Sequence, residues 1–462
     1  MTIVPTPQRW LALLQTLEAG LLERETAVRL ALLAALSGEH VLLIGPPGTA
    51  KSELARRLHR AFDGARYFER LLTRFSTPEE LFGPLSLKAL EADRYERQID
   101  GFLPTAGIAF LDEVFKANSA ILNALLTLLN EREFDNGSGR LRTPLISVIG
   151  ASNEVPADEA LQAFYDRFLL RVPVAGVGDA SFVALLRLPD TTPGPTPAPL
   201  TAAERAAVRS AAAEVEIGTD AIEACVALRG WLAGQDLVVS DRRWRQWIGL
   251  MRTAAASEGR GAIDRLDLWL VPYVAAACPD DVARIAQWYE AELLQAVPQE
   301  APWLTRAVEA FEQQLEIETT APPIDDDGAA GKLALARAIG AGEGSESGPL
   351  RMASQRLEAA LRRRYSTVHV AARLAQIEEI IEQVRRGHAE LAQRLAMLGG
   401  QLALRLWLPP ALSERWLAAH ARSVAVLAAL QQRLEQTRAG FAALPVDAEL
   451  PALAPAPVAL EA

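Results

Sequence analysis

The sequence has little cysteine, no obvious signal sequence and no long apolar run. Only two cysteines occur among 462 residues, and Cys225 and Cys278 stand in apolar helical stretches without a CxxC spacing. We therefore expect core thiols in a reducing compartment, not a disulfide or a metal site. No stretch approaches the ~18 apolar residues of a membrane span, and no basic segment precedes an apolar one at the start. These absences favour a cytoplasmic protein without a transmembrane segment.

Positive charge is also in short supply. Lys and Arg number 47 against 58 Asp and Glu, which gives a formal net charge of −11. This balance disfavours general binding to nucleic acids or anionic membranes, without excluding a local basic patch. Hydrophobic residues, by contrast, make up 50% of the chain. That share suffices for real cores, and the length predicts two or three domains.

Residues 41–52 are the stretch around which the chain is organised. Positions 41–44 have the apolar character of a short central strand, a Gly/Pro turn follows, and helical spacing begins near Ala50. Because such a loop turns backbone N–H groups inward at the positive end of a helix, it favours a polyphosphate. Lys51 is predicted to reach the β- and γ-phosphates, and the Ser52 hydroxyl to contact Mg²⁺. The residues predicted to contact the nucleotide are Gly45, Pro46, Pro47, Gly48, Thr49, Ala50, Lys51 and Ser52.

Ala50 replaces the second glycine of the G-x-x-x-x-G-K-[ST] pattern. Since a Cβ atom disfavours positive φ, we expect a negative φ at Ala50 and a loop that follows its usual path. A chance Lys-Ser pair after a Gly/Pro turn is the alternative interpretation. The strand before the loop and the helix after it both argue against that alternative.

The turn at residues 20–25 precedes the phosphate-binding loop at 45–52, which we call the cradle, by one helix. It is placed to cover the base of a nucleotide, with Leu22 and Val28 as an apolar wall. Ordinary packing between two helices explains the same residues equally well. Leu22 is therefore a candidate contact for the base.

Two adjacent carboxylates follow a second apolar strand at 108–111. Ligands of open α/β sheets bind at the carboxyl ends of the strands. Asp112 is therefore predicted to order Mg²⁺ and Glu113 to polarise the attacking water. A helix N-cap is the alternative, but the cradle requires such a partner. Asn153 ends another core strand at 145–151 and should lie beside Asp112, where its amide can hold the water or touch the γ-phosphate; an Asx-turn is the alternative.

Arginines occur at two places suited to an anion outside their own element. The segment 160–171 leads into a last strand on the flank of the domain, too far from its own cradle but suited to the nucleotide of a neighbouring subunit. Farther on, Ser240 or Asp241 caps a helix whose first turn contains Arg242 and Arg243. Because positive charge opposes the helix dipole there, the pair hints at an anionic partner. Two solvated arginines are the alternative.

The rest of the chain divides at changes of composition. A β-hairpin is expected near 85–103, and Pro-rich or polar linkers separate the domains. The C-terminal region has regular heptad spacing from Val370 to Leu398. Breaks at Gly399-Gly400 and Pro409-Pro410 separate it from a second long helix at 412–438, which predicts an antiparallel helical arm. The predicted bounds are 1–187 for the nucleotide-binding domain, 188–200 for a linker, 201–300 for a helical lid, 301–317 and 351–441 for the arm, 318–350 for a flexible linker and 442–462 for a disordered tail.

These motifs together resemble those of the AAA+ ATPases, and among them the MoxR group. Residues 45–52 resemble the Walker A motif, residues 110–113 the Walker B motif, and Asn153 the sensor 1 residue. Residues 240–242 resemble the start of the helix with the sensor 2 arginine, and residues 85–103 the insert in helix 2. The segments 73–80, 130–132, 165–168 and 239–244 further resemble the subfamily called regulatory ATPase variant A, RavA. The resemblance implies a five-stranded parallel α/β core, a helical lid, an all-α arm and a ring, usually a hexamer.

The same resemblance implies an ATPase that uses ATP and Mg²⁺ to remodel or mature a client protein. Arg167 is then the expected arginine finger, with Arg171 and Arg132 as competitors, and Arg242 the sensor 2 arginine. A partner with a von Willebrand factor A domain is expected for the wider group. A lysine decarboxylase partner is doubtful, because the small β-rich domain with which RavA binds it is missing. The alternatives are a nucleotide-dependent assembly scaffold with little turnover and a DNA-associated motor, which the acidic balance disfavours.

Overall fold

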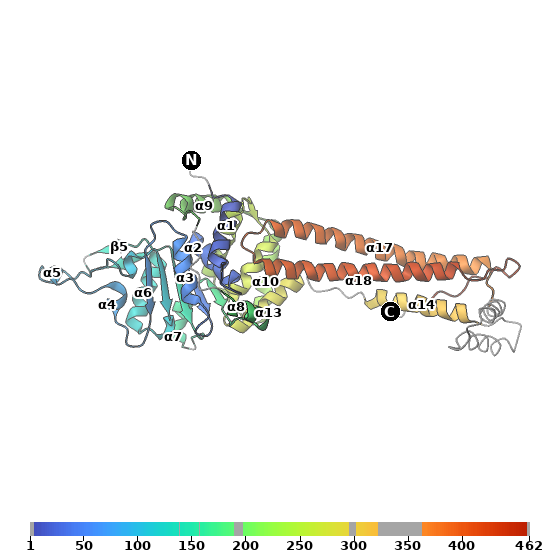
Figure 1. The fold of residues 1–462 in the computed structure, drawn as a ribbon, viewed down its shortest axis with the longest axis horizontal. Coiled ribbons are helices and arrows are strands. Elements are labelled where there is room, and N and C mark those ends of the chain that lie inside the picture. Colours follow the sequence, from blue (N-terminus) through green and yellow to red (C-terminus); the bar gives the residue numbers. More distant parts are fainter. Residues whose placement is uncertain are drawn as a thin grey trace. The chain divides into compact units, whose positions relative to one another are not determined.

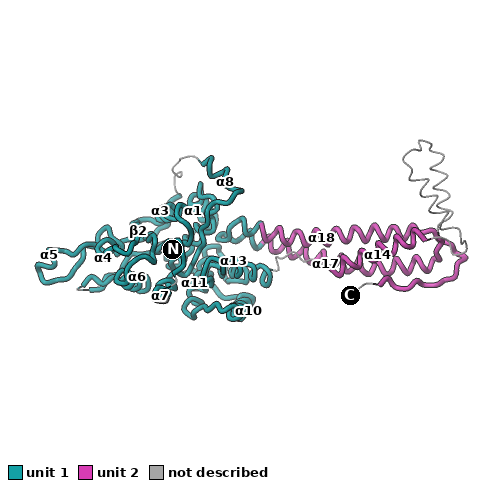
Figure 2. The backbone as a smooth tube through the Cα atoms, turned by 90° about the horizontal axis from the view of Figure 1, so that it is seen from below, with its two compact units in different colours: residues 1–295, 401–414 teal, residues 296–400, 415–462 magenta. Residues whose placement is uncertain are grey.

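The computed structural model describes residues 4–137, 139–156, 158–188, 197–294, 302–321 and 363–459. The chain splits into two compact units, residues 1–295 with 401–414 and residues 296–400 with 415–462 (Figure 2). Most of the predicted linkers at 188–200 and 318–350 lies outside the described residues. Among those described, no helix combines the length and apolar character needed to cross a membrane.

The first unit contains a five-stranded, all-parallel sheet in the order β2-β3-β6-β1-β7 (Figure 1). Its strands are β1 (Val41–Ile44), β2 (Tyr67–Leu71), β3 (Ile108–Asp112), β6 (Ser147–Ser152) and β7 (Leu170–Pro173). The central strands β1 and β6 are buried along their whole length, which explains their continuous apolar sequence. The predicted parallel sheet is confirmed, and all its carboxyl ends meet at one edge.

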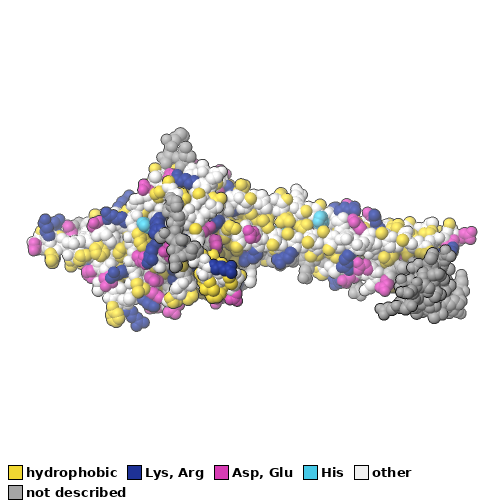
Figure 3. Space-filling model, viewed as in Figure 1, with side chains coloured by type: hydrophobic (Ala, Val, Ile, Leu, Met, Phe, Trp, Pro, Cys, Tyr) yellow, Lys and Arg dark blue, Asp and Glu magenta, His cyan; other side chains and the backbone are white. Residues whose placement is uncertain are grey.

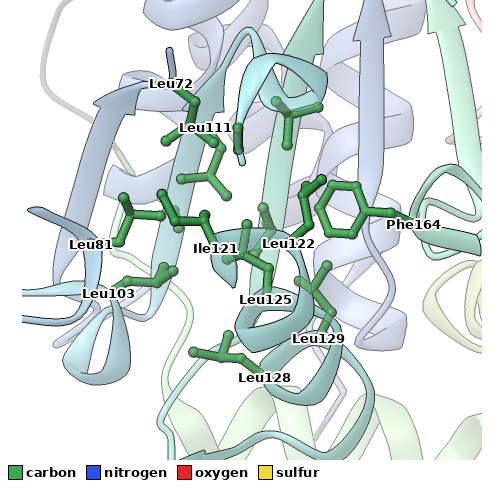
Figure 4. Packing of buried hydrophobic residues seen from close by; sticks show 14 of the residues in the cluster. Leu72, Leu81, Leu103, Leu111, Ile121, Leu122, Leu125, Leu128, Leu129 and Phe164 are labelled. Atoms are coloured by element: carbon green, nitrogen blue, oxygen red, sulfur yellow. The ribbon is translucent and has the colours of Figure 1, made fainter. Parts of the chain in front are cut away.

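Helices cover the sheet and place its loops. They are α1 (Pro7–Glu18), α2 (Glu25–Ser37), α3 (Lys51–Arg60), α4 (Pro78–Phe82), α6 (Ser119–Glu131) and α7 (Glu159–Tyr165). Helix α8 (Asp179–Leu186) follows the last strand, and none of its residues is buried. In α6, Ile121, Leu125 and Leu128 recur at helical spacing and are fully buried. They pack toward Leu111 of β3 and Leu103, as Figure 4 shows. This core fixes the end of β3, where the acid pair begins.

The predicted hairpin at 85–103 is a single bridge in the structure. Leu85 pairs antiparallel with Arg97, but the tip between them contains the short helix α5 (Leu87–Leu90). The Ser86 hydroxyl accepts a hydrogen bond from Ala89 N at 3.3 Å, so a local cap favours the helical turn over a longer ladder. Nearby, β4 (Glu133–Asp135) and β5 (Arg140–Arg142) form a small antiparallel pair that the sequence did not predict.

The lid is helical, as predicted. Its elements are α9 (Ala202–Glu214), α10 (Thr219–Gly234), α11 (Asp241–Ser257), α12 (Val271–Ala275) and α13 (Pro279–Trp288), with a short parallel pair of β8 (Glu216–Ile217) and β9 (Ala262–Ile263). Residues 401–414 also belong to this first unit. There the Trp407 ring is buried against Trp10, and its Nε1 donates to Ser257 Oγ at 2.7 Å.

The second unit is a bundle of α14 (Pro302–Thr320), α17 (Thr367–Ala403) and α18 (Pro410–Ala442). Its core combines Phe311, Ile381 and Leu434, one from each helix. The predicted break at Gly399-Gly400 is wrong, because α17 continues to Ala403, whereas the one at Pro409-Pro410 agrees with the start of α18. Each glycine costs the helix ~1 kcal/mol relative to alanine, which is too little to end a helix of 37 residues.

The predicted disorder over 442–462 is also not found where the structure describes this segment. Residues 443–459 lie against the bundle. The Tyr365 backbone N–H donates to Pro445 O at 2.9 Å, and the Arg373 guanidinium donates to Ala456 O at 2.7 Å. Prolines lack N–H donors but keep their carbonyls, so donors of the bundle can hold a proline-rich segment without a ladder.

Candidate functional site

The loop between β1 and α3 is the centre of the site. Gly45 packs so closely that an added Cβ would lie 2.0 Å from Val174 O, and its N–H donates to Ser152 O at 3.0 Å. Gly48 has a φ of +78°. The first glycine therefore locks the loop onto the ends of β7 and β6, and the second turns it toward the helix.

Ala50 corrects our expectation about this loop. Its φ is +63°, in the left-handed region, and it occupies the N-cap position of α3. The prediction of a negative φ is wrong: the turn into the helix demands the glycine-like conformation even though the residue has a Cβ. A non-glycine residue there costs about 1–2 kcal/mol, and such strain is typical of loops held for function.

Lys51 lies in the first turn of α3 and is buried, with 8% of its surface exposed. Its Nζ donates to Gly45 O at 2.6 Å and to Pro46 O at 2.8 Å. Burial lowers the pKa of Lys51, while the charges of Asp112 and Glu113 act in the opposite direction. An ammonium group has three donors, so one remains for an anion in front of the loop.

The acid pair and Asn153 come together at the same edge of the sheet. Asp112 ends β3, and its Oδ1 accepts from Glu113 N at 3.0 Å. The Asn153 amide donates to Glu113 Oε1 at 2.5 Å, and Lys116 Nζ lies 3.2 Å from the other oxygen. The structure thus brings Asn153 beside the pair, as the order of the strands predicted. Glu113 is also held in the left-handed region, with φ +52°.

The oxygen atoms at this edge suit Mg²⁺. Ser52 follows Lys51 in α3, and Asp112 stands two strands away at the end of β3. A hydroxyl and a carboxylate are ligands that Mg²⁺ prefers, and it usually takes only one or two from protein and the rest from phosphate and water. The donor set therefore fits a magnesium nucleotide.

Glu113 faces a pocket of about 820 Å³. Its lining includes the acidic residues Glu154 and Asp158 and the basic residues Arg74 and Lys116. The carboxylate is therefore reached from outside the chain through a space bordered by charge. Such a pocket can admit both water and a cationic side chain from another molecule.

Arg24 is a site residue that the sequence analysis missed. It is 6% exposed, and its Nε donates to Thr49 O of the cradle at 3.1 Å while NH2 donates to Ala175 O at 2.5 Å. It therefore ties the cradle to the segment after β7. Leu22, the predicted base contact, is half-buried in the same turn. The sequence gives little indication of this role for Arg24, because an arginine between two glutamates is typical of a solvated surface.

Two of the predicted finger arginines bond within their own chain, where Arg171 is buried and Arg132 is half-buried. Arg171 is 8% exposed, donates to Ala276 O at 2.8 Å and lies 3.9 Å from the Tyr165 ring centre. Arg132 donates to Gly38 O and Leu145 O, and burial lowers its pKa to about 10. Both guanidinium groups satisfy internal carbonyls, so neither is presented to another molecule.

Arg242 lies at the amino edge of the sheet, opposite the cradle. Its NH2 donates to Asn130 Oδ1 at 3.0 Å, near the end of α6. One turn later in α11, Gln246 donates to Glu39, which precedes β1. Since the cradle follows β1, Arg242 faces away from the phosphates of its own chain. Arg167 precedes β7 at the same edge, and its Nε has no hydrogen-bond partner among the described residues.

Arg243, the neighbour of Arg242, is a structural residue. It is 3% exposed and donates to Val274 O of the lid at 2.7 Å. It also donates to Asp166 Oδ1, at 3.0 Å, and to the carbonyls of Phe168 and Leu169. Of the two arginines at the start of α11, one therefore clamps the lid to the sheet and the other is exposed.

Glu39 makes the stability of this edge depend on pH. Burial raises its pKa to about 7 from 4.5, against the opposing effect of Arg132. A carboxyl group with a raised pKa stabilises the fold below its unfolded pKa and loses that contribution as pH rises to about 7. We expect unfolding free energy to fall across this window in the parent, and Glu39→Gln to be more stable by about 2 kcal/mol above it. Urea titrations at both ends of the window measure this, and parallel pH profiles for the two proteins would contradict it.

Comparison with known proteins gives consistent similarities. Residues 8–191 match a family model described as the MoxR domain in the MoxR-vWA-beta-propeller ternary systems, and residues 220–289 match the AAA lid domain. The uncharacterized protein MJ0079 of Methanocaldococcus jannaschii is 40% identical over 280 residues, which cover 59% of this chain and 71% of the relative. Protein MoxR of Paracoccus denitrificans is 29% identical over 288 residues, which cover 55% of this chain and 84% of that relative. The match to the solved structure of a putative ATPase from Cytophaga hutchinsonii covers 61% of this chain and 86% of that one, with 16% sequence identity and a TM-score of 0.45.

Proposed function

Because the chain belongs to the MoxR family of AAA+ ATPases, we propose that it hydrolyses ATP to ADP and phosphate and uses the energy to remodel or mature a client protein. One observation carries the chemical part. The cradle, which includes Lys51, lies at the same edge of the sheet as the Asp112–Glu113 pair. The Asn153 amide donates a hydrogen bond to Glu113 of that pair. This is the set of groups that phosphoryl transfer to water requires.

The residues act by position and charge. The cradle N–H groups and the third Lys51 donor hold the β- and γ-phosphates, and Ser52 and Asp112 hold Mg²⁺. When bound, Mg²⁺ neutralises charge that develops on the phosphate oxygens. Glu113 accepts the proton of the attacking water, and Asn153 fixes the carboxylate in place. Lys116 Nζ lies 3.2 Å from the other oxygen of the same carboxylate and helps to hold it in place.

The arginines at the opposite edge support a ring. Arg242 and Arg167 lie away from the phosphates of their own chain, so they serve a nucleotide only on a neighbouring copy. Arg167 is the proposed finger, since Arg171 and Arg132 are occupied internally. A repeated head-to-tail contact of this kind closes into a ring, for which we propose six copies by analogy with related ATPases.

The partner follows from the family model. Its description names MoxR-vWA-beta-propeller systems, so a protein with a von Willebrand factor A domain is the proposed partner. The segment where RavA has its decarboxylase-binding domain falls at 318–350, most of which lies outside the described residues. Membership of the RavA subfamily and a cytoplasmic location remain predictions from the sequence, and so does the absence of a lysine decarboxylase partner.

Lys51→Ala tests the nucleotide site. The variant loses the charge in front of the cradle, and we expect ATP affinity to fall by about 100-fold or more, since charge-assisted contacts to phosphate contribute about 1.5–3 kcal/mol each. Isothermal titration with ATP measures the change. Lys116→Ala removes a lysine at the same edge that is not on the cradle, and it should bind ATP like the parent. Equal affinity of Lys51→Ala and the parent would refute the proposed function.

A further inference from the structure

Helix α8 buries none of its side chains against the part of the chain that the structure describes, and its Ser181 forms a hydrogen bond with Glu23. None of its residues is buried, although the sequence from 179 to 186 is mostly apolar. Phe182, Val183 and Leu186 are 50%, 54% and 70% exposed. Figure 2 shows the helix projecting from one side of the first unit, and Figure 3 shows hydrophobic side chains gathered over it. Single exposed apolar residues are ordinary, but a whole apolar helix in water indicates a contact surface.

A groove without an occupant lies elsewhere on the same unit. It measures about 400 Å³ and runs between α10 and the start of α11 in the lid. Its apolar lining includes Val226, Ile222 and Ile248, of which the first two are 68% and 50% exposed. Figure 2 shows α10 on the side of the unit opposite to α8. The two apolar surfaces therefore cannot meet inside one chain.

We infer that α8 of one copy docks into the lid groove of the next. The charges at the two surfaces are complementary. The groove is bordered by Arg229 and Arg245 with Asp241, whereas α8 begins at Asp179 and is followed by Arg187. Asp179 can therefore pair with one of the two groove arginines and Arg187 with Asp241, which favours one orientation of docking.

The positions of the two surfaces relative to the cradle support this contact. Residues just before α8 border the cradle, because Ala175 O and Thr49 O accept from the same Arg24 guanidinium. The groove, in turn, lies beside Arg242, which is one helical turn from Arg245 on α11. Docking brings Arg242 of one copy toward the cradle side of the next. The inference rests here on the proposed role of Arg242 between copies.

The contact is head-to-tail, since helix and groove are different surfaces. Such an interface leaves an unused helix at one end and an unused groove at the other until the ring closes. The lone helix is smaller than a standard interface of about 1,600 Å². It therefore acts as an apolar anchor inside a larger face, and loss of an anchor weakens association by about tenfold or more.

Two single substitutions test the inference. Leu186→Asp places a charge on the helix, and Val226→Asp places one in the groove; each should shift the mass distribution from large assemblies to monomers. Sedimentation with a non-hydrolysable ATP analogue measures the distribution. Met397→Asp, which changes a side chain of α17 that is 56% exposed, should assemble like the parent. Assembly of either docking variant at parental strength would overturn the inference.

Mixing the two variants gives a sharper result. A Val226→Asp chain keeps its helix and a Leu186→Asp chain keeps its groove, so one intact contact forms and the mixture should contain dimers but no rings. A mixture that stays monomeric would overturn the head-to-tail contact. The two proposals fail in distinguishable ways, because sedimentation measures assembly and not hydrolysis. If the parent assembles but does not hydrolyse ATP, the proposed function is wrong and this inference stands. If the parent hydrolyses ATP and both docking variants still form rings, this inference is wrong and the proposed function stands.

Discussion

A Glu113→Gln variant is expected to bind ATP as tightly as the parent and to hydrolyse it about 10²–10⁴-fold more slowly. The amide keeps the size of the carboxylate but cannot take a proton from water. Asn153 and Lys116 hold the carboxylate now, at 2.5 Å and 3.2 Å, and a glutamine keeps the contact with the Asn153 amide through its own oxygen. Phosphate release under single turnover measures the chemical step, and nucleotide titration measures binding.

Glu154→Gln is the matched control for this experiment. Glu154 lines the same pocket as Glu113 and follows Asn153 directly, but it has no bond to the cradle or the acid pair among the described residues. Its loss of charge should leave the rate within about twofold of the parent, as for surface changes away from a site. Equal rates for Glu113→Gln and the parent would remove Glu113 as the base. Equal losses in both variants would show that the pocket charge, and not one base, controls turnover.

The sequence predicted the site well wherever a short motif follows a strand. Lys51, Glu113 and Asn153 each stand at a carboxyl end, and the order of the strands in a parallel sheet brings such ends together. Arg24 escaped prediction because its partners, Thr49 and Ala175, are distant in the chain. No local pattern encodes contacts over such separations.

Local rules also failed where the surroundings override them. Ala50 adopts a positive φ because the loop requires it, and Gly399-Gly400 stays helical within α17 although glycine disfavours the interior of a helix. The pair at 242–243 was ambiguous for a related reason. Two adjacent arginines look alike in sequence, and only the packing of the lid decides that Arg243 is buried and Arg242 exposed.

Arg243→Ala is expected to lower the free energy of unfolding by about 3–5 kcal/mol, the range found when one partner of a buried charged network is removed. The guanidinium donates to Val274 of the lid and to three residues beside the sheet, Asp166, Phe168 and Leu169. Each acceptor left without a donor pays its own desolvation penalty. Burial lowers the pKa of Arg243, which shows how little water reaches it.

Arg242→Ala is the natural control, because it removes the same side chain one position earlier in the same helix. It breaks one exposed hydrogen bond to Asn130, and we expect a change within about 0.5 kcal/mol. Arg243→Lys should fall between the two, since a lysine restores the charge but not the planar set of donors that reaches acceptors on four residues. Urea denaturation of the three variants gives the order. If Arg243→Ala and Arg242→Ala were equally stable, the lid would be held to the sheet by apolar packing alone, and the two arginines would differ only in exposure.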